Sequence, residues 1–191
     1  MPKIILASGS PRRRELLAKL YDKFDIITSE VDESLPPEVS PVSGVEILAI
    51  RKGEAVAKTL DSDSVVISSD TLVELDGVPL GKPTSREDAH RMLSALSGKY
   101  HNVHTGIAVH YAGRAVSGVA SARVKFKPLN DGEIYAYIDG GEPMDKAGAY
   151  AIQGEGGKFI EGYDGDFDTI MGLSVSLTKS LIERAVGDNN D

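Results

Sequence analysis

The chain has 191 residues, of which 41% are hydrophobic and 26% charged, and it contains no cysteine. This length suits a single domain, 1–191, and is too short for two independent domains of ordinary size. The lack of cysteine excludes disulfides, thiolate catalysis and cysteine-ligated zinc, and the formal net charge of -8 argues against general affinity for nucleic acids. Without a signal-peptide core or an apolar run of membrane-spanning length, we expect a cytoplasmic protein with no membrane partner.

The first predicted elements are a strand over residues 3–8 and a helix over residues 11–20. Ser10 is a preferred N-cap residue, and Pro11 suits the first helical position. Three arginines follow at once, although the partial positive charge of a helix N-terminus disfavours cations. The cluster therefore predicts an anionic ligand such as a phosphate chain, held by N–H groups, serine hydroxyls and guanidinium groups, unless the run is ordinary solvated surface.

Helical spacing divides the three arginines. Arg12 and Arg13 lie one turn ahead of the apolar pair Leu16 and Leu17, so we predict that they face back toward the end of the first strand. Arg14 is predicted to point into solvent. Contacts with an anion are therefore expected from the first two arginines and from Ser8.

A lysine interrupts the apolar face of the next helix. The pattern predicts a strand over 24–28, an acidic segment over 29–33, a proline-marked loop and then a helix over 43–60. Lys52 falls in the middle of the apolar stripe of this helix. A lysine there either extends along the edge of the core into solvent or reaches into a site, and the stripe alone is compatible with both.

A carboxylate follows the apolar run of residues 64–69, which predicts a buried strand. This strand would deliver Asp70 at its carboxyl end, where ligands bind in α/β sheets. The plainer role for Asp70 is in a turn or a helix cap. With Glu33 or Asp32 nearby, it would instead bind a divalent metal or take a proton from an attacking water. Oxygen ligands favour Mg²⁺ or Mn²⁺ over zinc.

Turn and capping signals mark the remaining elements. They predict a hairpin over 72–80, a helix over 86–96, a second hairpin of strands 102–111 and 115–127, a helix over 131–139, strands over 148–153 and 158–163, and a last helix over 175–185. Tyr150 and Gln153 fall on the strand 148–153. The Gln153 amide is suited to reading a base edge, whereas Tyr150 is suited to packing.

Other chemistries have weaker support. His101 and His104 are three apart on a predicted strand and would point to opposite faces, and His90 and His110 lack partners at chelating spacing, so we assign all four to structure or surface. The glycines of segment 154–157 open no helix, which excludes a P-loop. No serine stands in a Gly-x-Ser-x-Gly elbow, so hydrolysis by activated water is favoured over nucleophilic catalysis.

Five segments resemble, in order, the motifs of the Maf family of nucleoside triphosphate pyrophosphatases. They span nearly the whole chain, and their order makes the resemblance specific. The segments are 6–17, Ser69-Asp70-Thr71, Gly81-Lys82-Pro83, Leu96-Ser97-Gly98 and 142–154. The resemblance implies an α/β fold in which an elongated mixed sheet with flanking helices forms two lobes around a nucleotide cleft, as in ITPase-like proteins.

The resemblance also implies cleavage of a nucleoside triphosphate to the monophosphate and pyrophosphate. Asp70 would be the catalytic base, and Glu33 with Asp70 would engage the divalent metal. The phosphates would be held, and charge on the leaving group neutralised, by Ser8, Arg12, Arg13, Lys52 and Lys82. A homodimer is expected from the same resemblance.

Within the family, the combination of Arg12, Thr71 and Gln153 looks like the branch that acts on dTTP and UTP, including modified pyrimidines. Two motifs depart from the family's pattern. Residues 172–174 read Gly-Leu-Ser where the family usually has Gly-Leu-Pro, and residues 68–71 read Ser-Ser-Asp-Thr where Gly-Ala-Asp-Thr is common. We expect Ser174 to loosen the start of the last helix.

Two alternative functions remain open. The first is a nucleotide-binding regulator of cell division and septum formation without significant turnover, since such a protein would have the same pocket. The second is a pyrophosphatase for deaminated purines such as ITP. A pure binder needs no base beside the phosphates, so pyrophosphate release from a panel of triphosphates separates these functions.

Overall fold

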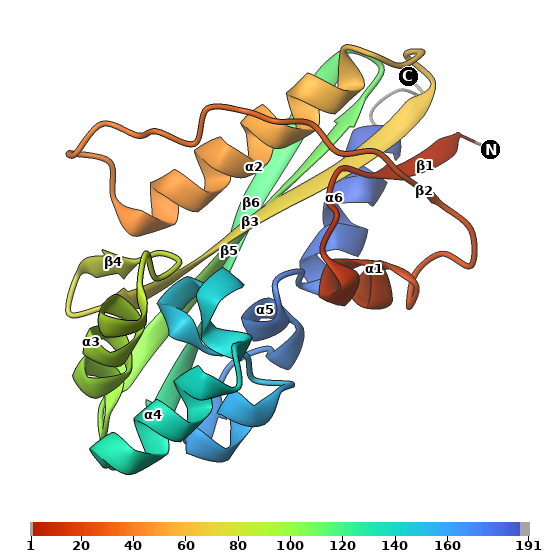
Figure 1. Cartoon of the computed structure of the whole chain (residues 1–191). Coiled ribbons are helices and arrows are strands. Elements are labelled where there is room, and N and C mark those ends of the chain that lie inside the picture. The colour runs from red at the N-terminus through yellow and green to blue at the C-terminus, as the bar shows by residue number, and fades with distance from the viewer. Residues whose placement is uncertain (1, 188–191) are drawn as a thin grey trace. The chain divides into compact units, whose positions relative to one another are not determined.

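The computed structural model describes residues 2–187 and has an α/β fold (Figure 1). Its strands are β1 (Lys3–Leu6), β2 (Asp25–Ile26), β3 (Ser64–Leu75), β4 (Val78–Leu80), β5 (Tyr100–Tyr111), β6 (Arg114–Phe126) and β7 (Ile160–Asp164). Its helices are α1 (Pro11–Leu17), α2 (Pro41–Ala57), α3 (Arg86–Leu96), α4 (Asp131–Asp139), α5 (Phe167–Met171) and α6 (Val175–Gly187). Short 3₁₀ turns cover Glu142–Asp145, Ala147–Ala149 and Glu155–Phe159.

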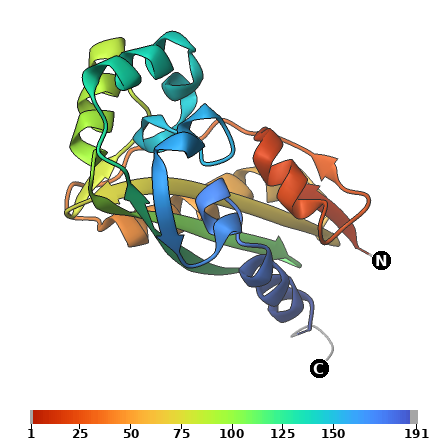
Figure 2. The same ribbon diagram turned by 90° about the horizontal axis from the view of Figure 1, so that it is seen from below.

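The strands form one mixed sheet in the order β2-β1-β3-β5-β6-β7, with β4 paired to β3. Strand β1 pairs in parallel with β2 and β3, whereas β3–β4 and β6–β7 are antiparallel. The strands β3, β5 and β6 are neighbours of 12 or 13 residues each, and Figures 1 and 2 show them side by side. The predicted mixed sheet with helices is therefore confirmed.

Contacts divide the chain into two compact units. Within the described residues, the first unit comprises 2–70, 105–120 and 172–187, and the second comprises 71–104 and 121–171. Strands β3, β5 and β6 each contribute residues to both units. The lobes and the nucleotide cleft that the family resemblance implies stay predictions.

Helices that carry a capping signal lie where the sequence predicts them. Helices α3 and α4 have the predicted bounds, and the side chain of Asn130 and that of Glu133 cap α4 reciprocally. Ser10 caps α1 by accepting a hydrogen bond from the backbone of Arg13. Helix α2 begins at Pro41 instead of residue 43, because Ser40 is the cap and the proline occupies its first turn.

Strand β3 is longer than predicted, and this corrects the place of Asp70. The strand continues without a break into the hairpin with β4, so Asp70 lies inside it instead of at its carboxyl end. The polar residues 68–71 interrupt the apolar run, but the backbone stays extended because Val73 and Leu75 are again buried and paired with β4.

The predicted strand over 148–153 is wrong. Gly148 and Ala149 have positive φ angles of 67° and 63°, which no strand accommodates, and the segment forms 3₁₀ turns instead. Gln153 therefore lies in a turn between short helical segments. The second strand of this region is confirmed as β7, whereas α5 was not predicted.

Helix α2 lies unusually close to the sheet in the first unit. A Cβ at position 106 of β5 would stand 2.2 Å from the carbonyl oxygen of Val45. A Cβ at position 53 of α2 would stand 2.5 Å from both Ser68 Oγ and His110 Nδ1. The Ser68 hydroxyl also donates to the Ala49 carbonyl at 2.7 Å. The distance at which α2 packs against β3 and β5 thus depends on two glycines and one serine.

We predict that Gly106→Ala destabilises the protein by more than about 2 kcal/mol, because the new methyl group meets backbone that cannot move without displacing α2. Chemical denaturation measures this loss. The control is Gly162→Ala in β7, where a Cβ would have no neighbour within 4 Å. Equal stabilities of the two variants would show that α2 does not depend on this close contact.

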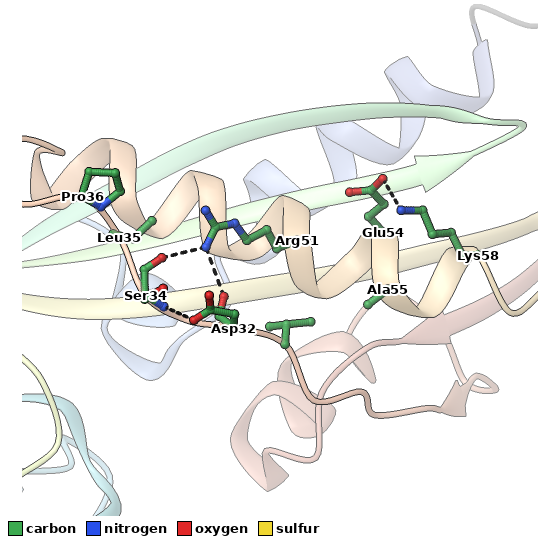
Figure 3. A pocket seen from close by; sticks show the side chains of 9 residues that line it. Asp32, Ser34, Leu35, Pro36, Arg51, Glu54, Ala55 and Lys58 are labelled. Atoms are coloured by element: carbon green, nitrogen blue, oxygen red, sulfur yellow. Dashed lines mark hydrogen bonds and ion pairs between the residues drawn. The ribbon is translucent and has the colours of Figure 1, made fainter.

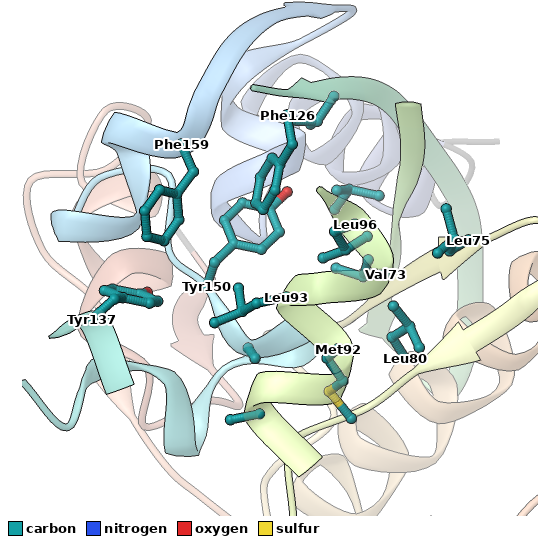
Figure 4. Close-up of a cluster of buried hydrophobic side chains, with 14 of the residues drawn as sticks. Val73, Leu75, Leu80, Met92, Leu93, Leu96, Phe126, Tyr137, Tyr150 and Phe159 are labelled. Carbon is teal, nitrogen blue, oxygen red and sulfur yellow. The ribbon is translucent and has the colours of Figure 1, made fainter. Parts of the chain in front are cut away.

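The second unit has an aromatic core, part of which is shown in Figure 4. Phe126, Phe159, Tyr137 and Tyr150 pack edge to face or tilted in successive pairs. His101 lies against Phe126 and its Nε2 is 2.7 Å from the Tyr150 hydroxyl. Burial lowers the pKa of His101 to about 4. Tyr150 therefore packs, which is the role its sequence context suggested.

Burial of neutral His101 predicts a pH-dependent stability. Its pKa of about 4 in the folded chain lies below the ordinary value of about 6.5, so its contribution is complete above pH 6.5 and is lost as the pH falls toward 4. His101→Gln should flatten the fall in unfolding free energy over this window by about 1.4 kcal/mol per pH unit. Urea unfolding at several pH values measures the slope, and an unchanged slope would contradict the assignment.

Candidate active site

Arg13 is held at both ends of its guanidinium group in the first unit. Its Nε donates to the Gly172 carbonyl at 3.0 Å, and its Nη1 donates to Ser8 Oγ at 3.3 Å. The same Ser8 oxygen accepts from the Ser10 N–H at 3.2 Å. Burial lowers the pKa of Arg13, while the nearby charge of Asp70 acts in the opposite direction. A half-buried guanidinium thus lies beside a serine hydroxyl, directly after the first strand.

The other two arginines differ from Arg13 in exposure. Arg14 is exposed, as the helical spacing predicted, and Arg12 is half-buried. The charge of Arg12 is close enough to Arg13 to lower its pKa further. Two cations are therefore gathered at the start of α1, an arrangement that an anion would stabilise.

The side chain of Lys52 reaches into a group of charged residues instead of extending into solvent, because it contacts two carboxylates. Its Nζ is 2.6 Å from Asp70 Oδ1 and 2.8 Å from Glu33 Oε1. The side chains of Lys52 and Asp70 are only 19% and 15% exposed, whereas that of Glu33 is 59% exposed. One ammonium group thus joins the middle of β3 to the acidic segment after β2.

Two serines next to Asp70 form hydrogen bonds that connect β3 to neighbouring segments. Neither was identified as a site residue from the sequence. Ser69 Oγ donates at 2.9 Å to the Gly172 carbonyl, which also accepts from Arg13. Ser68 Oγ bonds to α2, the helix that carries Lys52. These residues stand where the family commonly has glycine and alanine. Their polarity inside an otherwise apolar strand was the available signal.

Ser174 corrects an expectation about the last helix. Its hydroxyl oxygen accepts from the Leu177 N–H at 3.4 Å, and its carbonyl accepts from Thr178 Oγ1 at 2.7 Å. The residue caps α6 instead of loosening its start, since serine is a preferred N-cap. Serine at position 174, in place of the expected proline, therefore caps the start of α6.

Three predicted substrate residues belong to the second unit. Thr71 follows Asp70 in β3 and is half-buried. Lys82 lies just after β4, and Gln153 lies in a turn; both are exposed. Their association with the cluster of the first unit stays a prediction.

The turn that follows Gln153 is organised by Glu142, another residue that sequence reasoning missed. The Glu142 carboxylate accepts from the Tyr137 hydroxyl at 2.5 Å and from the N–H groups of Glu155 and Gly156 at 3.0 Å each. Burial raises the pKa of Tyr137, which keeps it a hydrogen-bond donor. The carboxylate is thus occupied by structural contacts next to the turn that carries Gln153.

Among residues 2–187, no group of three or more histidine or acidic side chains is arranged to hold a metal ion. Two of the histidines contact acidic side chains. His104 contacts Glu74 and Ser121, and His90 contacts Asp131 and stacks on Tyr135.

None of the helices within residues 2–187 combines the length and apolar character of a membrane span.

The model of the Maf-like protein family matches residues 3–185. This chain belongs to the Maf family. It is 43% identical over 189 residues to a dTTP/UTP pyrophosphatase of Bdellovibrio bacteriovorus, covering 96% of this chain and 98% of the relative. It is 47% identical over 184 residues to a dTTP/UTP pyrophosphatase of Moorella thermoacetica, covering 95% and 94%. A solved nucleoside-triphosphatase / dITP/XTP pyrophosphatase from Mycobacterium abscessus aligns with a TM-score of 0.47 and 12% identity, covering 97% of this chain and 96% of that chain.

Proposed function

We propose that this chain is a nucleoside triphosphate pyrophosphatase that hydrolyses dTTP, UTP and modified pyrimidine nucleotides to the monophosphate and pyrophosphate. The observation that carries the proposal is the Lys52 ammonium between the carboxylates of Asp70 and Glu33, in the same unit as Arg13 and Ser8. A protein that only binds triphosphates needs no base beside the phosphates, whereas a hydrolase needs a group that takes a proton from water. The Maf relatives named dTTP/UTP pyrophosphatases support the choice of substrate.

In the proposed reaction, Arg12, Arg13 and Ser8 hold the phosphate chain. Arginine suits this role because its guanidinium donates two parallel hydrogen bonds to phosphate oxygens. The Gly172 carbonyl and Ser8 already orient the Arg13 guanidinium group. Binding of the substrate therefore costs little side-chain conformational entropy at this residue.

Asp70 takes the proton from a water molecule that attacks the α-phosphorus, and the bond to the β-phosphate oxygen breaks to release pyrophosphate. Lys52 touches Asp70 and lies where it neutralises the charge that develops toward the leaving group. Lys82, in the second unit, is proposed to add a second ammonium group. Positioning and electrostatics supply the rate, and the reaction needs no covalent intermediate.

The donor set of the first unit fits a divalent cation. Mg²⁺ and Mn²⁺ are bound by one or two carboxylates together with substrate phosphates, and Asp70 and Glu33 are two carboxylates drawn to one point by Lys52. These two side chains would hold the cation, which would neutralise phosphate charge when bound. Full coordination by protein groups is not required, in accord with the absence of a larger acidic cluster in the described residues.

Base recognition is assigned to Arg12, Thr71 and Gln153. The amide of Gln153 carries both a donor and an acceptor, which matches the imide edge that thymine and uracil share.

The same proposal treats the chain as one Maf-like domain that forms a homodimer and has no nucleic-acid partner. The single family match over residues 3–185 supports the one-domain organisation.

We predict that Asp70→Asn lowers kcat for dTTP by about 100-fold or more, because loss of a general base costs about 10²–10⁴. Nucleotide affinity should change little, since the phosphate ligands remain. Pyrophosphate release and nucleotide titration measure the two effects. Asp22→Asn, at an exposed position, is the control of equal charge change.

Pyrophosphate release by Asp70→Asn at near the original rate would show that the base is wrongly assigned. A panel of triphosphates with Mg²⁺ or Mn²⁺ tests the function itself. Release from none of them would favour the regulatory binder, and preference for ITP would favour the deaminated-purine enzyme.

A separate prediction concerns Gln153. Gln153→Ala should raise KM for dTTP and UTP with little change in kcat, because the amide contacts the base and not the reacting phosphate. Steady-state kinetics with both nucleotides measure the change. A fall in kcat with KM unaltered would place this residue in the chemical step and contradict its assignment to the base.

A further inference from the structure

The acidic loop that carries Glu33 is fastened to α2 by an arginine outside the predicted site. Arg51 Nη1 donates to the carbonyl oxygens of Asp32 and Ser34 at 3.1 and 2.8 Å. These are the residues immediately before and after Glu33. Figure 3 shows the guanidinium reaching from α2 to both carbonyls. Residues of the loop and of α2 line a groove of about 730 Å³ there.

The loop has a second restraint of its own. The Asp32 carboxylate accepts from the Ser34 N–H at 2.8 Å, which closes a turn around Glu33. This contact fixes the local shape of the loop, but it does not tie the loop to another element. Arg51 supplies that tie, because it belongs to α2.

Arg51 and Lys52 are consecutive residues of α2 that hold the same loop in two ways. Arg51 binds the main chain on both sides of Glu33, and Lys52 binds the Glu33 carboxylate at 2.8 Å. The Glu33 side chain is 59% exposed, and solvent screening weakens an ion pair at such exposure. The pair with Lys52 alone is therefore a weak restraint on where Glu33 lies.

We infer that Arg51 is a positioning residue that holds the main chain around Glu33 so that this carboxylate stays beside Lys52 and Asp70. The inference rests on the proposed function for its catalytic consequence, since Glu33 is the proposed partner of Asp70 toward the divalent cation. Arg51 acts through Glu33, because its hydrogen bonds go to the main chain on either side of that residue.

The test compares Arg51→Gln, Glu33→Gln, the double variant and Lys58→Gln. Lys58 is the matched control, because this cation at the C-cap of α2 lines the same groove, and it pairs only with Glu54 at 2.8 Å in the described residues. We expect Arg51→Gln to lower kcat/KM for dTTP as much as Glu33→Gln does, and the double variant to be no worse than Glu33→Gln alone. Arg51→Lys should restore part of the activity, because one ammonium can still donate to a loop carbonyl.

A second readout follows the loop without turnover. Since the chain has no cysteine, a spin label at Pro37→Cys, an exposed position near the groove, reports loop motion uniquely. Arg51→Gln should increase the mobility of the label, whereas Lys58→Gln should leave it unchanged. Thermal unfolding of each variant checks that the fold is retained.

The outcomes separate the inference from the function on which it rests. Additive losses in the double variant, or unchanged label mobility in Arg51→Gln, would overturn the positioning role. If the wild-type protein hydrolysed no nucleotide, the proposed function would fail, and the mobility of the label would still decide whether Arg51 holds the loop.

Discussion

One ammonium group shared by two carboxylates joins three segments of the first unit. Lys52 bonds to Asp70 and Glu33, which come from β3 and from the loop after β2, and it reaches them from α2. Removing such a shared partner leaves two like charges facing each other, which costs more than losing an ordinary surface pair. Lys52 thereby holds charged side chains from α2, β3 and the acidic loop together.

The packing below this interaction sets its geometry. Glycines at 53 and 106 let α2 approach β3 and β5 to distances that any side chain would prevent, and Ser68 bonds across the contact. The neighbouring residue Ser69 shares the Gly172 carbonyl with Arg13, which connects α1 to the strand that carries Asp70. Small and polar residues around Asp70 thus serve the placement of charge more than the formation of the strand.

Local patterns predicted the elements well where a cap or a turn signal marked their ends, as for α3, α4 and the hairpin of β3 with β4. They failed where residue type did not determine the backbone or the partner. Strand β3 continues through its polar residues into the hairpin with β4, and segment 148–153 is not a strand because Gly148 and Ala149 have positive φ angles. Lys52 remained ambiguous because an apolar stripe contains no information about which carboxylate lies opposite. Three further residues were not identified from the sequence, because their partners are backbone groups and residue type alone does not predict such contacts. They are Ser69, Glu142 and Arg51.

We propose that these charges direct water to the α-phosphorus of a pyrimidine nucleoside triphosphate. Hydrolysis of dTTP in ¹⁸O-labelled water, followed by mass spectrometry of both products, tests this most directly. Attack of water at the α-phosphorus places one labelled oxygen in dTMP and leaves the pyrophosphate unlabelled. Label in the pyrophosphate, or release of orthophosphate in its place, would contradict it.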